Sequence, residues 1–413
     1  MYSSSILATI MVLAAEVAAI PSARGGLTGY SQAKHVLPLY RTADATSGSF
    51  EADITIGSQT VRAIMDTGSS DPFFMPQDVQ CLNITTNQPI SSDLCGFKGP
   101  KLALNPYFRL IPNVHSNLTF GTGESAIAFN GYTNISFGGI VVPQQEIELA
   151  KTASITYPGN ASGIVGLAYP LLTTVYPGDD PSTDIICNTS IGVNDISCNR
   201  QSISPLLSTI FSSSLAPPIF SFAIGRGAPA AGVMTIGGVP NIHDAQVNVT
   251  NKATRVTVPI EKLEGHQGYF YYTTSVDGFR YSGAPAGEGN GQYIVDTGTV
   301  PITIGPKDAK AFGVLFNPPA QKQGATWYVY CNSTAPNLGV TIGGQTFNIN
   351  PKDLILDMGQ TDPPGICFSG VQEGTTAGDF PPVLGSVFLR NVLAVFDVGQ
   401  TQMTFVAREH YKA

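Results

Sequence analysis

The sequence has little charge. Asp, Glu, Lys and Arg make up 12% of its 413 residues, against about 25% in ordinary soluble domains. No run of Lys or Arg occurs, and the formal net charge is -8. Because nucleic-acid binding requires a basic surface that displaces counterions from phosphate, the chain is not expected to bind nucleic acid. Helical periodicity is also scarce, and only residues 203–212 and 306–312 are candidates for short helices.

Long hydrophobic runs are missing after the N-terminus. No later segment has the roughly 18 apolar residues of a transmembrane helix, so no membrane association is expected once a leader is removed. Residues 1–19 contain a mostly apolar stretch and end in Val17-Ala18-Ala19, small residues placed for signal-peptidase cleavage. We predict a secretory signal peptide over 1–19. A short membrane anchor is the alternative, because no positive charge precedes the apolar stretch and Glu16 interrupts its end.

Cysteine spacing gives no sign of a metal site. The six cysteines form no Cys-x-x-Cys pair and the five histidines are scattered, so neither a metal nor another cofactor is expected. An even number of cysteines behind a leader indicates disulfides, although six thiols allow 15 pairings. We predict pairing between sequence neighbours, since each pair brackets a loop with Gly, Asn or Pro. The predicted disulfides are Cys81–Cys95, Cys187–Cys198 and Cys331–Cys367.

Glycosylation sequons agree with a secretory route. Single Asn-x-Ser/Thr triplets are common by chance, so only their density is informative, and they act as acceptors only in a secretory compartment. The seven sequon positions are Asn83, Asn117, Asn134, Asn160, Asn188, Asn248 and Asn332. The protein is therefore predicted to be a secreted, extracellular glycoprotein.

Short β-rich runs separated by turn residues fill the chain from Ser49 onward. The 44 Gly and 30 Pro supply the turns. Runs bounded by Gly, Pro and Asn predict strands, and their number predicts an all-β fold with few short helices. The clearest runs are 50–56, 61–65, 125–129, 233–236, 293–295 and 392–396.

The two halves of the chain repeat one pattern. In the first half, the apolar run 61–65 leads into Asp66-Thr67-Gly68-Ser69, and a hydrophobic segment with Gly follows at 163–168. In the second half, 293–295 leads into Asp296-Thr297-Gly298-Thr299, and a similar segment follows at 383–388. A repeat of this kind changes the fold prediction. It predicts two related lobes.

The repeated turns predict a pair of facing carboxyl groups. A carboxylate directly after a buried strand is costly unless it is hydrogen-bonded or shares a proton, and the hydroxyls of Ser69 and Thr299 can donate to it. If the halves pack about a pseudo-twofold axis, Asp66 and Asp296 face each other and share one proton. One carboxyl group can then act as a base toward water while the other acts as an acid toward a carbonyl, which hydrolyses an amide without a covalent intermediate.

At this point the chain resembles the pepsin-like aspartic protease family. The resemblance extends from about Phe50 to Val406, and it implies a bilobal fold with a central cleft. Its lobes would be 48–222 and 223–413, after a short propeptide-like segment at 20–47. The matching segments are the two Asp-Thr-Gly turns, 119–123 for a hairpin flap, 163–170, 236–238, 384–385, 395–397 and 403–406.

The resemblance also implies roles for single residues. Asp66 and Asp296 would be the catalytic pair, and Thr67 and Thr297 would cross-bond the two active loops. Contacts to the substrate backbone would come from Gly68, Gly298 and the flap residues Gly121 and Thr122. Ser69 and Thr299 are expected to support the carboxylates.

The flap departs from the family pattern. Phe120 stands where the family usually has Tyr, and no Trp follows the first active loop. We expect apolar packing of Phe120 against Phe73 or Phe74; the alternative is that Phe120 is simply a half-buried strand residue. Apolar subsites lined by Phe73, Phe74, Phe120 and Ile302 would favour cleavage between bulky hydrophobic residues.

The segment before the first lobe is short and weakly basic for an inhibitory prosegment. Its stretch 36–41 could lie over the cleft, with Arg41 or Lys34 near the aspartates. Whether the segment makes the chain a zymogen stays open.

The sequence thus predicts a secreted, monomeric aspartic endopeptidase that acts on polypeptides at acidic pH. The alternative is a non-catalytic binding or inhibitor-like protein on the same scaffold, which the unusual flap and the seven sequons would suit. A hydrolase that uses Ser or His finds no support, because no Gly-x-Ser-x-Gly motif is present.

Overall fold

Strands and turns make up most of the folded chain. The computed structural model describes residues 27–41, 49–103, 108–121, 123–157, 159–186, 198–227, 230–250, 252–357, 365–374 and 381–409. Helices among these residues are short: α1 (Leu206–Ser212), α2 (Pro306–Gly313), α3 (Ser386–Leu389) and the 3-10 turns η1 (Leu27–Gly29), η2 (Pro170–Leu172), η3 (Pro181–Thr183) and η4 (Pro351–Leu354). The predicted all-β class with few short helices is confirmed.

One large sheet runs through both halves of the chain. Its strands, in spatial order, are β13 (Val175–Pro177), β8 (Arg109–Thr119), β9 (Ser125–Phe137), β10 (Ile140–Ala153), β4 (Pro72–Phe74), β12 (Gly163–Gly166), β3 (Gln59–Asp66), β2 (Glu51–Ile56), β1 (His35–Tyr40), β15 (Ala230–Ile236), β14 (Ile219–Ile224), β29 (Val392–Asp397), β30 (Gln402–Ala407) and β16 (Arg255–Pro259). Strands β5 (Gln80–Leu82) and β6 (Pro89–Ile90) extend it beside β10.

Smaller sheets complete the fold. A five-stranded sheet carries the second active loop: β17 (Thr273–Val276), β19 (Gly291–Val295), β28 (Val383–Leu384), β20 (Ile302–Ile304) and β27 (Val371–Glu373). The others are β18 (Gly278–Arg280) with β23 (Leu338–Ile342) and β24 (Gln345–Ile349); β21 (Gln321–Gln323) with β22 (Thr326–Tyr330), β26 (Ile366–Ser369) and β25 (Ile355–Leu356); and β7 (Gly96–Phe97) with β11 (Thr156–Tyr157).

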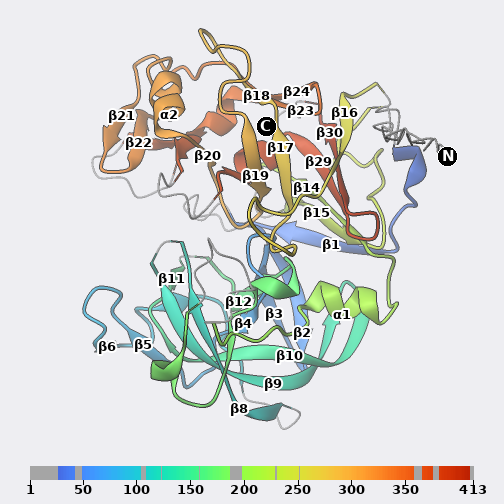
Figure 1. Cartoon of the computed structure of the whole chain (residues 1–413), viewed down its shortest axis with the longest axis vertical. Helices are drawn as coiled ribbons and strands as arrows, with labels where there is room; N and C mark the ends of the chain where they lie inside the picture. Colours follow the sequence, from blue (N-terminus) through green and yellow to red (C-terminus); the bar gives the residue numbers. More distant parts are fainter. Residues whose placement is uncertain are drawn as a thin grey trace, which may run out of the picture.

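The chain forms two lobes joined by the middle of the large sheet. Figure 1 shows one lobe above the other, with β1 in blue between them beside β15. The boundary expected between residues 222 and 223 falls inside β14. β14 pairs with both β15 and β29 in the sheet that the two lobes share, so the boundary at 222/223 stays a prediction.

The segment expected to be propeptide-like contains a structural strand. β1 pairs antiparallel with β15 from His35 to Tyr40, and Leu37 and Leu39 are buried in the main core. The prediction that residues 36–41 lie over the cleft is therefore wrong for the strand, since alternate apolar side chains fix it in the sheet. The folded chain begins well before the expected boundary at residue 48.

The two basic residues of that segment, Lys34 and Arg41, differ in their surroundings. Lys34 is exposed. Burial lowers the pKa of Arg41, and the nearby charge of Asp353 opposes this change. The charge of Tyr157 acts on Arg41 in the same direction.

The apolar run before the first active loop is buried on both faces. Val61, Ala63, Ile64 and Met65 of β3 are all buried, because β3 lies between β2 and β12 and has packed side chains above and below it. Asp66 is the last residue of β3 and lies at the centre of the molecule. β19 does the same in the second lobe for Asp296, beside β17 and β28.

Two of the three predicted disulfides lie fully in the described chain and are confirmed. Cys81 and Cys95 are joined with a Cα–Cα distance of 5.7 Å, and Cys331 and Cys367 with 5.0 Å. Cys198 is also disulfide-bonded, while its predicted partner Cys187 lies outside the described residues. Cys81, Cys95 and Cys367 are buried.

The asparagines of the sequons differ in their exposure and in their hydrogen bonds. Asn134, Asn160 and Asn332 are exposed, and Asn134 Oδ1 accepts from the Gln144 amide at 3.0 Å. Three others are half-buried and hydrogen-bonded: Asn83 Oδ1 accepts from the amides of Thr85 and Thr86, Asn117 Nδ2 donates to Asp184 Oδ2 at 2.7 Å, and Asn248 Nδ2 donates to the Glu409 carbonyl at 2.9 Å. Asn188 lies outside the described residues.

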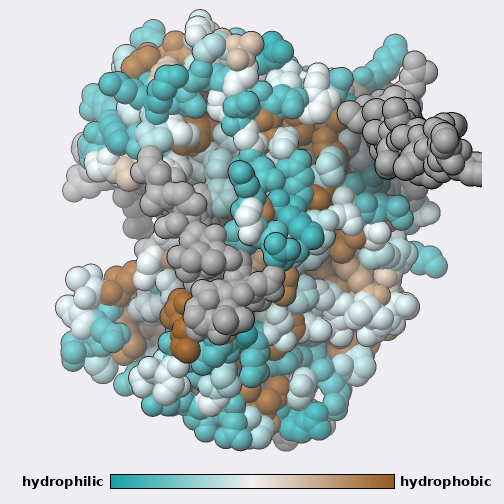
Figure 2. Space-filling view, in the orientation of Figure 1, coloured by the Kyte–Doolittle hydropathy of each residue, from teal (hydrophilic) through white to brown (hydrophobic). Residues whose placement is uncertain are grey.

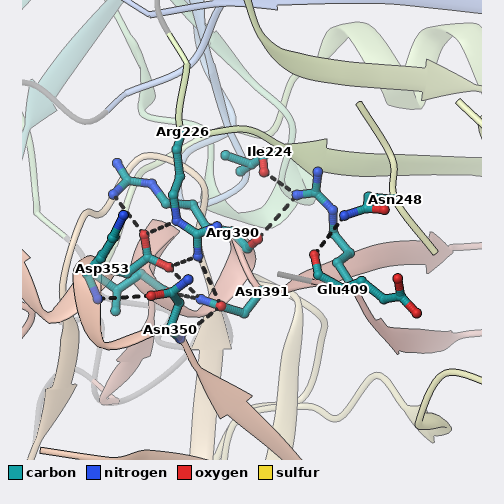
Figure 3. A network of polar contacts seen from close by, with 11 residues as sticks. Ile224, Arg226, Asn248, Asn350, Asp353, Arg390, Asn391 and Glu409 are labelled. Atoms are coloured by element: carbon teal, nitrogen blue, oxygen red, sulfur yellow. Dashed lines mark hydrogen bonds and ion pairs between the residues drawn. The ribbon is translucent and has the colours of Figure 1, made fainter. Parts of the chain in front are cut away.

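A buried ionic network ties the second lobe to the shared sheet (Figure 3). Arg226, after β14, donates Nε to Asp353 Oδ1 at 2.6 Å and a second bond to Oδ2. Asn391 donates to Asp353 Oδ2 at 2.9 Å, and Arg390 lies 3.8 Å from Oδ1.

Among the described residues, no helix is long and apolar enough to cross a membrane.

Candidate active site

The two Asp-Thr-Gly turns meet where β3 and β19 end. Asp66 Oδ1 accepts from the Gly68 amide at 2.8 Å and Oδ2 from Ser69 Oγ at 2.6 Å. Asp296 Oδ1 accepts from the Gly298 amide at 2.7 Å, and its Oδ2 accepts from Thr299 Oγ1 at 2.5 Å. Each carboxyl group is thus held by the same two kinds of donor, as the sequence repeat led us to expect.

The threonines connect the two turns across the interface between lobes. Thr67 donates its amide to Thr297 Oγ1, and Thr297 donates its amide to Thr67 Oγ1. Their hydroxyls then donate to the carbonyls of Val295 and Met65 at 2.8 and 2.7 Å. These four buried hydrogen bonds all join one lobe to the other. They fix the position of one active loop relative to the other.

The glycines face the opposite aspartates. A Cβ at Gly68 would lie 2.5 Å from Asp296 Cγ, and one at Gly298 would lie 2.7 Å from Asp66 Cγ. Only hydrogen fits at these positions. The two carboxyl groups therefore lie against each other's loops.

Burial and a neighbouring carboxylate favour the protonated form of Asp296. Burial, and next the charge of Asp66, raise the pKa of Asp296, while the bonds from Thr299 and the Gly298 amide lower it. A buried carboxyl group with a raised pKa can share one proton with a carboxylate beside it. Asp296 is the member of the pair whose pKa is raised.

The hydrophobic segments of the repeat pass through the active loops. Leu167, after β12, donates its amide to the Asp66 carbonyl at 2.8 Å, and Ser386, after β28, donates to the Thr299 carbonyl at 2.8 Å. A Cβ at Gly166 would lie 2.5 Å from the Asp71 amide nitrogen, and one at Gly385 would lie 2.6 Å from the Thr299 carbonyl oxygen. Both segments need glycine because the backbone of the active loop lies where a side chain would otherwise be.

A cavity of about 750 Å³ lies over the carboxyl pair. In Figure 2 the surface is indented between the two lobes at the left of the view. The cavity is lined by residues of both active loops: Asp66, Gly68, Ser69, Asp296, Gly298 and Thr299. Its aromatic lining residues are Phe73, Phe97, Phe120, Tyr157 and Tyr271.

Two of the expected subsite residues do not line the cavity. Phe74 and Ile302 are absent from the cavity lining and belong to the main hydrophobic core, so their expected role is corrected. Strand alternation explains the first case, because neighbours on β4 point to opposite sides. Phe73 lines the cavity and Phe74 points into the core.

The predicted flap is a hairpin. β8 and β9 pair antiparallel up to Thr119 and Ser125, and the Phe120 amide donates to the Glu124 carbonyl at 2.8 Å. Phe120 is half-buried and packs on a hydrophobic cluster that contains Phe73. Gly121 is exposed at the turn and lines the cavity, while Thr122 lies outside the described residues.

The sequence did not single out several other lining residues. Tyr271 precedes β17, and burial, then the charges of Asp296 and Asp66, raise its pKa. Glu124 follows the flap and accepts from the amide and hydroxyl of Thr156 at 2.7 and 2.9 Å. Asp71 stands five positions after Asp66, a spacing that could have drawn attention to it.

No group of His, Cys, Asp and Glu that could hold a metal ion is found among the described residues. The site is built from a proton-sharing carboxyl pair, hydroxyl and amide donors, and an apolar cleft. Such a site can hold a water molecule and polarise a carbonyl through acid-base chemistry alone.

Comparisons with known proteins agree with this chemistry. The family profile described as "Eukaryotic aspartyl protease" matches residues 49–408. A probable aspartic-type endopeptidase of Aspergillus fumigatus is 32% identical over 369 residues, covering 87% of this chain and 78% of that protein. Rhizopuspepsin-1 of Rhizopus niveus is 25% identical and covers 87% and 79%.

A solved structure shows the same fold. The aspartic proteinase from Irpex lacteus superposes with a TM-score of 0.65 at 18% identity, covering 92% of this chain and 98% of the other. The family match spans both active loops and the flap. The chain therefore belongs to the eukaryotic aspartyl protease family, and it is an aspartic-type endopeptidase.

Proposed function

We propose that the chain is a secreted endopeptidase that cleaves polypeptides at acidic pH between bulky hydrophobic residues. The observation that carries the proposal is the pair of carboxyl groups that share a proton beneath an apolar cavity. A water molecule between them would lose a proton to Asp66 while attacking the peptide carbonyl carbon. Asp296 would give its proton to the carbonyl oxygen.

The intermediate then collapses without a covalent bond to the protein. Asp66, which gained the water's proton, passes it to the amide nitrogen as the C–N bond breaks. Asp296 takes a proton back from a hydroxyl of the intermediate as the carbonyl re-forms, so the pair again holds one proton. The donors around the carboxyl groups, Ser69 and Thr299, hold them in place through both steps. This is acid-base catalysis by two groups whose protonation differs.

The lining of the cavity supports a preference for apolar side chains. Phe73 and Phe120 lie on the flap side, and Tyr271 lies on the side of the second lobe. Burial of a large apolar side chain contributes about 1.5–3 kcal/mol, so subsites of this kind discriminate against small or polar residues. Digestion of a peptide library at several pH values would report the preference and the pH optimum together.

Secretion is supported by the apolar leader and the disulfides. The glycosylation sites we propose first are the exposed Asn134, Asn160 and Asn332. Monomeric action is proposed because one chain supplies both carboxyl groups of the site. Expression in a eukaryotic secretory host, with mass spectrometry of the N-terminus and the glycopeptides, would test secretion, and sedimentation would test the oligomeric state.

Loss of either carboxyl group tests the catalytic role. Asp66→Asn and Asp296→Asn should each abolish acidic cleavage of a denatured protein, while Asp78→Asn, at an exposed carboxylate, should leave it unchanged. Cleavage by purified Asp66→Asn or Asp296→Asn would contradict the mechanism. A folded wild-type protein with no turnover on any peptide would favour the non-catalytic alternative.

A further inference from the structure

A second carboxyl pair lies directly behind the first active loop. We propose that Glu148 is a positioning residue for this loop, whose protonated carboxyl group holds the Asp71 carboxylate and thereby fixes the loop that carries Asp66. The inference rests on the proposed function, because it concerns the same site. Neither residue was singled out by the sequence repeat.

Asp71 anchors the end of the active loop. Its side chain is 5% exposed. Oδ1 accepts from the Thr174 amide at 2.9 Å and Oδ2 lies 3.3 Å from the Thr174 hydroxyl. Its backbone carbonyl accepts from the Gly166 amide at 3.1 Å. Any movement of Asp71 therefore moves both the loop and the segment that passes through it.

Glu148 reaches this anchor from the neighbouring strand. It lies on β10 opposite Phe73 of β4 in parallel register, and it has no exposed surface. Oε1 lies 2.6 Å from Ser116 Oγ of β8. Oε2 is buried and meets no hydroxyl or amide donor among the described residues, so it is the atom placed to bond the Asp71 carboxyl group, whose charge acts on Glu148. A bond between two carboxyl groups exists only while one of them is protonated.

Glu148 is the member that holds the proton. Burial, and next the charge of Asp71, raise the pKa of Glu148 well above its usual value. Burial also raises the pKa of Asp71, but the bonds from Thr174 and Glu148 oppose this by stabilising its charged form. The bond therefore runs from the Glu148 hydroxyl to the Asp71 carboxylate.

The charged groups around the pair favour the same protonation state. Glu146, two positions earlier on β10, adds negative charge and accepts from Asn130 Nδ2 at 3.3 Å. The positive charge of Arg200 acts on Asp71. The buried pair His115 and Asp184, 3.0 Å apart, belongs to the other face of β8, because His115 and Ser116 are adjacent on that strand.

The pair therefore stabilises the loop only in its protonated state. A carboxyl group with a raised pKa contributes stability that is complete below its unfolded value, near 4.3, and is lost as the pH rises through the raised value. Above that pH two buried carboxylates would repel each other. Glu148 thus couples the position of the active loop to acidic conditions.

The test replaces the titrating proton by a permanent donor. Glu148→Gln keeps the shape and can donate from Nε2 to Asp71 at any pH. We expect kcat/KM at the acidic optimum to stay within about twofold of the wild type, and the pH at which the protein unfolds or loses its recoverable activity to rise by about one unit. The exposed Glu264→Gln is the matched control and should change neither.

A second variant removes the bond altogether. In Glu148→Leu we expect kcat at the acidic optimum to fall about tenfold or more with little change in KM, because the loop is displaced but the substrate cleft remains. Recovery of kcat in Glu148→Gln distinguishes positioning from simple packing. In Asp71→Asn the new side-chain amide can donate to Glu148, so this variant should also unfold at a higher pH than the wild type. It replaces Glu148→Gln in the test if that variant does not fold.

The proposal is overturned if the donor variants unfold at the wild-type pH, or if Glu148→Leu keeps the wild-type kcat. The unfolding measurement needs no substrate. An inactive wild-type protein would therefore refute the proposed function, whereas an unchanged alkaline limit in Glu148→Gln and Asp71→Asn would refute only the role of Glu148.

Discussion

Thr67 and Thr297 exchange hydrogen bonds across the two lobes, each donating its backbone amide to the other's hydroxyl oxygen, at 3.0 and 2.9 Å. Both side chains are fully buried. The exchange needs a hydroxyl at both positions, since each hydroxyl accepts from one amide and donates to one carbonyl. The distance between the catalytic carboxyl groups therefore depends on two side chains that do no chemistry.

Thr297→Val keeps the shape but removes one hydroxyl. The Thr67 amide and the Met65 carbonyl would each lose a buried partner, which costs about 2–4 kcal/mol in the free energy of unfolding. We expect kcat/KM to fall about 100-fold because the loops lose their register. Thermal unfolding and steady-state kinetics measure both effects, and Thr297→Ser, which keeps the hydroxyl, should recover most of each. Equal losses in the Val and Ser variants would contradict the explanation.

The position of Gly68 against Asp296 gives a steric prediction. A methyl group at Gly68 would overlap the Asp296 carboxyl group, so Gly68→Ala should lower kcat/KM by about 100-fold or more and destabilise the fold by about 1–3 kcal/mol. Gly29→Ala is the control, because nothing lies within 4 Å of a Cβ there. Near-normal activity in Gly68→Ala, measured on a peptide substrate, would mean that the two loops are further apart.

Local pattern was enough to predict the centre of the site. Each Asp-Thr-Gly turn follows a short apolar strand, and a repeat of this kind implies symmetry between halves. Asp66 and Asp296 could therefore be paired without coordinates. The same reasoning could have placed β1 in the sheet, because Leu37 and Leu39 alternate with exposed Val36 and Pro38.

Contacts set by strand order could not be predicted from the sequence. Glu148 meets Asp71 only because β10 pairs with β4 in parallel, and the two residues are far apart in the chain. Phe73 and Phe74 are equally apolar, and the sequence does not say which of them faces the cavity. Both are buried because β4 lies between β10 and β12.

Thr299 sets the proton affinity of the catalytic pair. Its hydroxyl donates to Asp296 Oδ2 at 2.5 Å and lowers the pKa that burial has raised. Thr299→Val removes this bond to the charged form, so the pKa rises further and the proton is kept to a higher pH. The alkaline limb of the kcat/KM profile should move upward by about one unit. Thr299→Ser should leave it in place, and a downward shift would refute the assignment.

Asp353 neutralises a buried cluster of arginines. Arg226 donates two hydrogen bonds to it, Arg390 lies 3.8 Å away, and the Asp353 side chain is only 2% exposed. Asp353→Asn removes the buried carboxylate charge that these guanidinium groups face, so the free energy of unfolding should fall by about 3–5 kcal/mol.

Asp53→Asn provides the matched control for this change. Asp53 pairs with Arg62 at 3.1 Å, but the two side chains are 49% and 33% exposed. Water screens such a pair, so its loss should cost no more than about 1 kcal/mol. Denaturant unfolding of both variants at one pH and salt concentration compares the two pairs directly. Equal losses would mean that the Asp353 network is hydrated in solution, since burial is what separates its expected cost from that of the surface pair.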